Sequence, residues 1–256
     1  MHNPKLAIDG ASLTLERLRQ FERERPVVEL ADAARARMRE SEATVVATVQ
    51  SGRTAYGINT GFGAFANRVI PAQKTKKLQL NLVRSHACGV GEPLPPALVR
   101  RMLLLKANNL AAGFSGVRPL VVDTLLALLN ADVLPVIPAQ GSVGASGDLA
   151  PLAHLALALI GEGEATMPAA AGDDTGIARR RELKDVDVLH AAGVEPLELQ
   201  AKEGLALLNG TQLSLSLALD GLFRAESLLD ASVVCCAMTV EGLAGSHVPF
   251  DDRIQQ

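Results

Sequence analysis

The stretch GSVGASGDLAPLAH, residues 141–154, decides the expected fold, because it joins a loop of small residues to an apolar helical run. Its first seven residues include three glycines and two serines, a composition that favours a tight loop over a helix. The alanine- and leucine-rich remainder predicts a helix over residues 149–160, with Asp148 as its N-cap and Gly161 after its end. We therefore expect a small-residue loop that leads directly into a helix N-terminus.

Residue types alone leave the chemistry of this loop open. A plain turn is the usual meaning of a Gly-Ser cluster. A serine-hydrolase nucleophile needs G-x-S-x-G, but here Gly147 follows Ser146 directly. A phosphate-binding loop needs a following Lys-Ser/Thr pair or G-x-G-x-x-G, and the sequence has neither. The fourth reading is backbone cyclisation, in which the Gly147 nitrogen attacks the Ala145 carbonyl. Loss of two waters, one taking the Ser146 hydroxyl, would then leave a methylidene on a conjugated ring.

Helical patterns fill most of the remaining chain. Expected helices cover residues 14–23, 31–50, 73–86, 95–112 and 119–130, and a short extended segment covers 133–137. A glycine-rich loop is expected at residues 56–63, and an exposed polar excursion, a small hairpin or a loop, at 166–185. From residue 199 the apolar helical pattern continues almost to the end. The sequence predicts a mainly α fold with minor β structure.

Composition excludes several functional classes. The 25 Lys and Arg residues nearly balance the 28 Asp and Glu residues, so nothing electrostatic favours nucleic acid or an anionic membrane. Cys88, Cys235 and Cys236 form no C-x-x-C pair, which favours a reduced, cytoplasmic setting. The N-terminus is not expected to be a signal peptide, and no apolar run reaches the roughly 20 residues that span a bilayer. The five histidines show no metal-ligand spacing.

Four motifs together resemble those of the histidine/phenylalanine ammonia-lyase family. They are YGINTGFG at 56–63, SHACG at 85–89, GSVGASGDLAPLAH at 141–154 and KEGLALLNGTQ at 202–212. The resemblance covers essentially the whole chain and loosens over residues 166–185. It implies that Ala145-Ser146-Gly147 cyclises to 4-methylidene-imidazol-5-one (MIO), an electrophile that needs no metal or nucleotide. It also implies a MIO-bearing N-terminal domain over residues 1–199, the start of a central helical bundle over 200–256, and a homotetramer.

The resemblance also implies roles for single residues. Tyr56 would be the general base that removes the substrate β-proton, although a phenol needs positive potential nearby to act as a base at neutral pH. Asn209 would orient the ring and the substrate, with Gln212 on the substrate side. Asp148 would support cyclisation as well as cap its helix. The plainer readings are a tyrosine packed over its loop and a helix C-cap at Asn209-Gly210.

Ser85-His86 carries the substrate preference. Family members that use phenylalanine resemble Phe-Leu at these positions and tyrosine-specific ones resemble His-Leu, whereas Ser-His is typical of enzymes acting on histidine. An imidazole can hydrogen bond a polar substrate ring. We therefore expect elimination of ammonia from L-histidine to give urocanate, with phenylalanine or tyrosine as alternative substrates. A solvated histidine is the plain alternative for His86, and His154 is expected to be a core or supporting residue.

Family enzymes are substantially longer than this chain. Their second half brings an arginine for the substrate carboxylate, a second tyrosine, a phenylalanine and a glutamate, none of which can be matched here. A half-length, non-catalytic fragment or assembly partner is therefore an alternative hypothesis. A serine hydrolase, with a triad built on Ser146 and His86 or His154, is a more distant one. We also expect exposed apolar surface over residues 205–243 and a tendency to aggregate.

Overall fold

The computed structural model describes residues 4–63, 66, 68–169 and 180–254. By their internal contacts the residues form two compact units, Met1–Ser214 and Leu215–Gln256. Compactness within a single chain does not define where a helical bundle begins. The domain boundary expected after residue 199 therefore stays a prediction.

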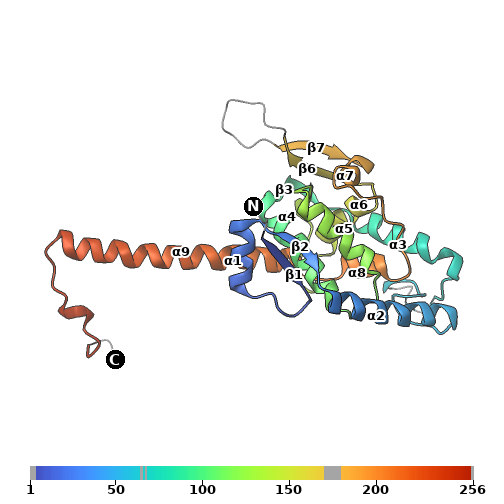
Figure 1. Cartoon of the computed structure of the whole chain (residues 1–256), viewed down its shortest axis with the longest axis horizontal. Helices are drawn as coiled ribbons and strands as arrows, with labels where there is room; N and C mark the ends of the chain where they lie inside the picture. Colours follow the sequence, from blue (N-terminus) through green and yellow to red (C-terminus); the bar gives the residue numbers. More distant parts are fainter. Residues whose placement is uncertain (1–3, 64–65, 67, 170–179, 255–256) are drawn as a thin grey trace. The chain divides into compact units, whose positions relative to one another are not determined.

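The first unit is built mainly from helices (Figure 1). The helices are α1 (Leu15–Glu24), α2 (Asp32–Gln50), α3 (Ala72–His86), α4 (Pro96–Ala111), α5 (Pro119–Asn130), α6 (Leu149–Leu159), α7 (Val186–His190), α8 (Glu203–Leu208) and the first residues of α9 (Gln212–Gly242). The mainly α prediction is confirmed, and all five helices expected before residue 131 are present within a few residues of their expected ends. Pro96 and Pro119 open α4 and α5 because a proline at the first helical position loses no hydrogen bond there.

Aliphatic side chains form the core of this unit. Helix α4 packs against α5, and α6 packs against α3 and α8 (Figure 1); most residues of α4, α5 and α6 are buried. The largest buried side chains are mostly Leu, Met and Ile, and Phe21 is the one buried aromatic among them. A core of flexible aliphatic chains suits closely packed helices. It forms a rigid base for the loops that follow α3, precede α6 and separate α8 from α9.

Three small sheets complete the first unit. Strands β1 (Lys5–Ile8) and β2 (Val27–Leu30) pair in parallel, and β3 (Val90–Pro93) pairs antiparallel with β5 (Pro138–Gln140). The third sheet has the order β4 (Leu134–Pro135), β6 (Glu164–Pro168), β7 (Arg180–Lys184), and all of its pairs are antiparallel. The two ends of the polar excursion are thus paired as the antiparallel strands β6 and β7, as in a hairpin. Residues 170–179 lie outside the described part of the chain.

The helical run expected from residue 199 is interrupted. Helix α8 begins at Glu203 and ends at Leu208, and α9 starts only at Gln212. Gly210 has φ +154°, which no helix can contain and which favours glycine. The plainer alternative, a helix C-cap at Asn209-Gly210, is what the structure shows, and the break is short because α9 begins at Gln212.

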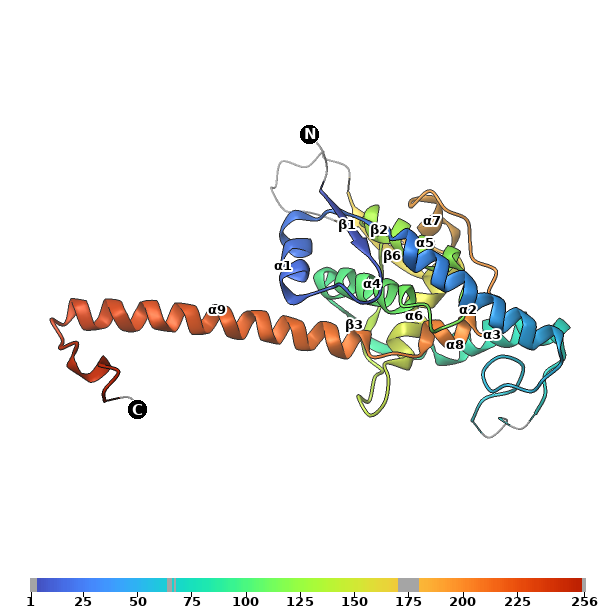
Figure 2. The same cartoon turned by 60° about the horizontal axis from the view of Figure 1, so that its bottom comes forward.

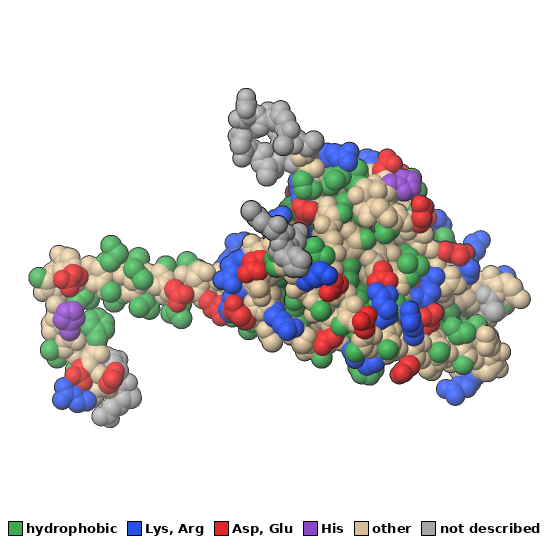
Figure 3. All heavy atoms as spheres, viewed as in Figure 1, with side chains coloured by type: hydrophobic (Ala, Val, Ile, Leu, Met, Phe, Trp, Pro, Cys, Tyr) green, Lys and Arg blue, Asp and Glu red, His purple; other side chains and the backbone are tan. Residues whose placement is uncertain are grey.

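The second unit consists of the rest of α9 and the 3-10 helix η2 (Val248–Phe250). Hydrophobic side chains are exposed along this part of α9 (Figure 3), among them Leu228, Leu229, Val233 and Met238. The expected apolar surface is confirmed for most residues from 215 onward, Leu219 excepted, but not before it, since Leu207, Leu208 and Leu213 are buried.

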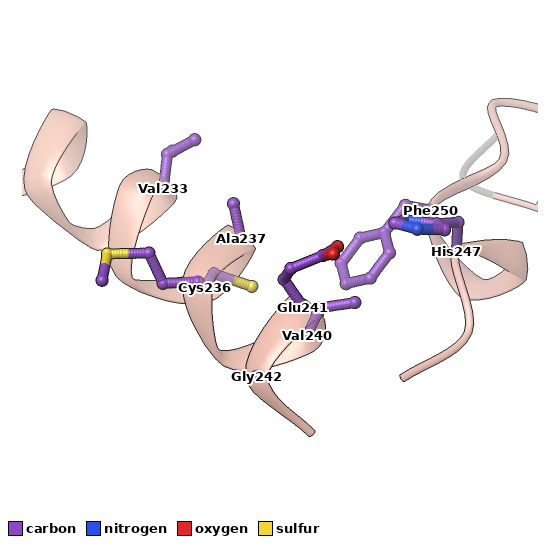
Figure 4. Close-up of a pocket in the computed structure, with 9 residues that line it drawn as sticks. Val233, Cys236, Ala237, Val240, Glu241, Gly242, His247 and Phe250 are labelled. Carbon is purple, nitrogen blue, oxygen red and sulfur yellow. The ribbon is translucent and has the colours of Figure 1, made fainter. Parts of the chain in front are cut away.

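An apolar pocket lies within the second unit, between the end of α9 and η2. Phe250 and His247 face Ala237, Val240 and Glu241 across it (Figure 4). None of the residues lining this pocket is a predicted site residue, so it does not mark the chemistry expected from the sequence.

No helix in the described ranges is both long enough and apolar enough to cross a membrane.

Candidate active site

The loop that precedes α6 carries the predicted triplet and presents it to solvent. Ala145 and Ser146 are exposed and Gly147 is half-buried. In Figure 2 the loop projects from the surface beside β3 and α6. No histidine in the described ranges hydrogen bonds to Ser146, so the serine-hydrolase reading gains no support. The small side chains leave the triplet backbone uncovered, as a reactive group that meets a substrate requires.

Asp148 fixes the inner end of this loop. Its carboxylate is fully buried and accepts hydrogen bonds from Ser142 Oγ (2.7 Å), Ser214 Oγ (2.7 Å) and the Ser214 backbone N–H (2.8 Å). Asp148 occupies the N-cap position of α6, as expected, but its side chain makes no capping hydrogen bond to that helix. The carboxylate instead ties the loop to the first turn of α9, 66 residues later.

Gly147 and Asp148 lie directly against the segment between α8 and α9. The Asp148 backbone N–H donates to Gly210 O at 2.8 Å. A Cβ at Gly147 would lie 3.2 Å from the same oxygen, so a side chain there would crowd the contact. Asn209 precedes this contact, and its side chain is exposed. The structure thus brings the triplet and the Asn209 segment together.

Gln212 opens α9 beside the same turn. It is buried, and its Oε1 has no hydrogen-bond partner within the described residues. A Cβ at Gly210 would lie only 2.2 Å from that oxygen, so Gln212 would have to move, and the φ of +154° is itself strained for a residue other than glycine. The side-chain amide of Gln212, which was expected to face the substrate, therefore packs against the turn at Gly210.

Two buried charged residues hold α8, and sequence reasoning missed both. Lys106, in the middle of α4, donates from Nζ to Ala206 O (2.7 Å) and Asn209 O (2.9 Å). At the other end of α8, Glu203 pairs with Arg118 at 2.8 Å and accepts from the Gln200 backbone N–H. A charged residue inside the apolar run LLLKA was the signal available in the sequence for Lys106.

Ser85 and His86 end α3, where a network of hydrogen bonds orients the imidazole. His86 Nδ1 lies 2.8 Å from Leu82 O, and Ser85 Oγ lies 3.0 Å from the same carbonyl and 3.1 Å from Nδ1. A carbonyl oxygen can only accept, so Nδ1 carries the proton in this bond. The half-buried ring then presents Nε2 as a hydrogen-bond acceptor.

His154 joins the end of α3 to α6, in agreement with its expected supporting place. Its Nε2 accepts from the Gly89 backbone N–H at 3.0 Å, and burial lowers the pKa of the imidazole from its ordinary 6.5. Gly89 also lies close to the start of the reactive loop, residues 141–147, which precedes α6. A Cβ at Gly141 would lie 3.2 Å from Gly89 Cα. Through Gly89, the SHACG motif at residues 85–89 thus contacts both ends of the 141–154 motif.

Tyr56 lies in a structured glycine-rich loop, as predicted. Its ring packs edge-on against Phe62, with centroids 6.1 Å apart, and the side chain is 60% exposed. Buried Asn59 closes the loop by accepting from Ala55 N–H and donating to Arg53 O. A Cβ at Gly57 would lie 2.5 Å from Leu205 Cδ2, so this loop packs on α8. All four motifs therefore meet around α8 and the start of α6.

The described ranges hold no group of three or more His, Cys, Asp or Glu side chains suited to a metal ion.

Comparison with known proteins connects this geometry to a family. The aromatic amino acid lyase family matches residues 13–256. A histidine ammonia-lyase of Anaeromyxobacter sp. (strain K) is 51% identical over 252 residues, which is 98% of this chain and 48% of that protein. The crystal structure of histidine ammonia-lyase from Trypanosoma cruzi has a TM-score of 0.84 at 39% identity and covers 98% of this chain and 47% of its own.

A phenylalanine aminomutase from Pantoea agglomerans is equally similar in structure, with a TM-score of 0.85 at 30% identity over 98% of this chain and 46% of that one. Similar backbones therefore accompany different named reactions, and the fold alone does not choose the substrate. The chain spans about half the length of the curated relatives it matches.

Proposed function

The chain belongs to the aromatic amino acid lyase family, and from this premise we propose that the protein is a histidine ammonia-lyase that converts L-histidine to urocanate and ammonia. Because the chain spans about half the length of those relatives, the activity, the substrate and the assembly are all part of the proposal. A homotetrameric assembly and a cytoplasmic setting belong to it as well, and they rest on the family resemblance and on cysteines that are not paired.

The hydrogen bonding of His86 carries the choice of histidine. With Nδ1 committed to Leu82 O, Nε2 is free to accept from the N–H of a substrate imidazole. A phenyl ring would leave this acceptor unpaired, and a site built to hydrogen bond a polar group discriminates strongly against an analogue that lacks it. Histidine is thus favoured over phenylalanine.

The residues of the reactive loop fit the prosthetic group that the family forms. Ala145, Ser146 and Gly147 lack bulky side chains, and the Asp148 carboxylate and Gly210 O hold the next residue in place. In the proposed cyclisation the Gly147 nitrogen bonds to the Ala145 carbonyl carbon, and two waters leave, one of them with the Ser146 hydroxyl. The group supplies an electrophile that no ordinary side chain offers.

The other residues would act on the substrate. Tyr56 is proposed as the base that takes the β-proton on its phenolate oxygen, and its exposed ring leaves that oxygen free to approach a ligand. Asn209, exposed and adjacent to the Gly147 contact, is proposed to orient the substrate. Gln212 would contribute by supporting the turn at Gly210 or, after a rotation of its side chain, by contacting the substrate.

Intact-mass measurement and a substrate assay test this proposal together. The protein, produced at the length its gene encodes, should weigh two waters less than the encoded chain and should form urocanate from L-histidine. L-phenylalanine and L-tyrosine should be turned over at least about a hundredfold less efficiently, as expected for an unpaired polar group in the site. Ser146→Ala is the matched control, because it keeps the loop small but removes the hydroxyl that must leave. An unmodified wild-type mass, or a preference for phenylalanine, would contradict the proposal.

A second candidate is that a chain of this length folds without catalysing the reaction. The exposure of Tyr56 and Asn209 favours it, since these residues do not enclose a substrate within this chain. Residues 1–256 produced alone should then lose two waters but form no urocanate. Turnover of histidine by residues 1–256 alone would rule out this second candidate, a chain that folds without catalysing the reaction.

A further inference from the structure

Lys106 is buried in a way that the expected reaction does not explain. Its side chain is 0% exposed and lies among the leucines of α4, where a charged or strongly polar group costs free energy unless it is hydrogen bonded. No carboxylate pairs with it in the described part of the chain. Its partners are instead two backbone carbonyls, Ala206 O and Asn209 O. Burial lowers the pKa of Lys106 to about 7, and both the charged and the neutral amine have enough N–H groups for two carbonyls.

These two carbonyls belong to the end of α8. In a continuing helix the amides of residues 210 and 213 would bond them. The chain leaves the helix at Asn209, because Gly210 adopts φ +154°. Lys106 therefore supplies the donors that the next helical turn would have supplied, from a helix about a hundred residues earlier in the sequence.

The turn that Lys106 holds is the one that touches the reactive loop. Gly210 O accepts from the Asp148 backbone N–H, and Gly147 packs against the same oxygen. A short chain of contacts thus runs from the Lys106 amine through Asn209 and Gly210 to the last residue of the triplet. Each link is a hydrogen bond of 2.7–2.9 Å or a direct backbone contact.

We propose that Lys106 is a positioning residue for the reaction, which fixes Asn209 and Gly210 and through them holds the Ala145-Ser146-Gly147 loop in the geometry that cyclisation and turnover require. Lys106 itself touches neither the triplet nor the substrate. This inference rests on the proposed function for its effect on the reaction, whereas its structural part, the anchoring of the turn at Gly210, stands independently.

Substitution of Lys106 tests both parts in the protein produced at the length its gene encodes. Lys106→Met keeps the length of the apolar stem and removes the donors, and Lys106→Arg restores them. Met102→Ala, one turn earlier on α4, is the matched control, because it also disturbs a fully buried side chain but has no bond to α8. Comparisons are made at temperatures where the variants have equal stability to unfolding.

Three readouts separate positioning from general damage. In Lys106→Met we expect amide exchange at Asp148 to be roughly tenfold faster than in Met102→Ala. A change of this size corresponds to the free energy of one hydrogen bond to a charged group. We expect the fraction of chains lacking two waters, and kcat for L-histidine, to fall by a similar factor with little change in KM. Lys106→Arg should restore part of each.

The outcomes are distinguishable from failure of the proposed function. If the wild-type protein neither loses two waters nor forms urocanate, the proposed function fails, and the Asp148 exchange rate still decides the anchoring role. Equal exchange at Asp148 in Lys106→Met and Met102→Ala overturns the inference. So does full maturation and turnover in Lys106→Met.

Discussion

The buried carboxylate of Asp148 gives the sharpest test of how the reactive loop is held. Three donors converge on it, the hydroxyls of Ser142 and Ser214 and the Ser214 backbone N–H, all within 2.8 Å. Hydrogen bonds to charged groups contribute about 1.5–3 kcal/mol each, and removing the acceptor leaves buried donors unpaired. Because the two hydroxyls can turn toward other acceptors, we expect Asp148→Ala to lower the free energy of unfolding by about 3–4 kcal/mol. Asp148→Asn keeps one acceptor oxygen and should lose about 1.5–2 kcal/mol.

Urea unfolding followed by circular dichroism measures these losses, with the surface variant Asp187→Asn as control. A substitution at such an exposed carboxylate should change the free energy of unfolding by no more than about 0.5 kcal/mol. The fraction of chains that lose two waters should fall in Asp148→Ala and stay unchanged in Asp187→Asn.

A double-mutant cycle with Ser214 tests the reasoning itself. If the carboxylate is the acceptor for this hydroxyl, Ser214→Ala should cost about 1.5–3 kcal/mol in the wild-type protein and almost nothing in the Asp148→Ala background. Additive losses would refute the argument, because they would mean that the two residues stabilise the fold independently. A loss in Asp148→Ala no larger than that in Asp187→Asn would refute it as well.

Three further predictions follow from the packing around the site. The pKa of the His154 imidazole is lowered in the folded state, so the stability that the neutral imidazole contributes is present above pH 6.5 and is lost as pH falls through the lower folded pKa. Urea midpoints measured from pH 7.5 to 4.5 should fall more steeply for the wild type than for His154→Gln. Parallel curves for the two proteins would contradict this. Glu203→Gln weakens the pair with Arg118 and should cost about 1–3 kcal/mol in urea unfolding, whereas an unchanged stability would show that the pair contributes nothing. Residues 1–256 alone should self-associate, as measured by light scattering, and replacing the exposed Leu228 and Leu229 by Glu should reduce the self-association. A monodisperse wild-type monomer would rule out self-association through the exposed apolar side chains of α9.

The parts of the fold that depend on neighbouring residues could be predicted from the sequence. Prolines at the first helical position mark the starts of α4 and α5, and runs of helix-forming residues with charged faces mark α1 and α2. The glycine content of the 56–63 segment is enough to exclude a helix. In each case the decisive interaction lies within one turn or one loop.

The interactions that shape the site are long-range, and no local pattern predicts which residues Asp148 and Asn209 contact. Asp148 looks like an N-cap because it precedes a helix, but its carboxylate bonds to Ser214, which only the tertiary fold brings near. Asn209 looks like an interior position because apolar residues flank it on both sides. The helix nevertheless ends there, because Gly210 adopts φ +154°, and Lys106 supplies the donors for the carbonyls at the end of α8.

The short helix α8 explains why residues far from the substrate can matter to the reaction. Six residues are too few for a stable helix in water, because nucleation costs more than one turn returns. It persists because both ends are anchored in the core, the first by Glu203 and Arg118, the second by Lys106. Asn209 follows immediately, so its place beside the triplet is set by core residues and not by the exposed loop. Precise positioning requires that exposed reactive residues be supported by buried ones, so substitution of the buried anchoring residues should also impair the reaction.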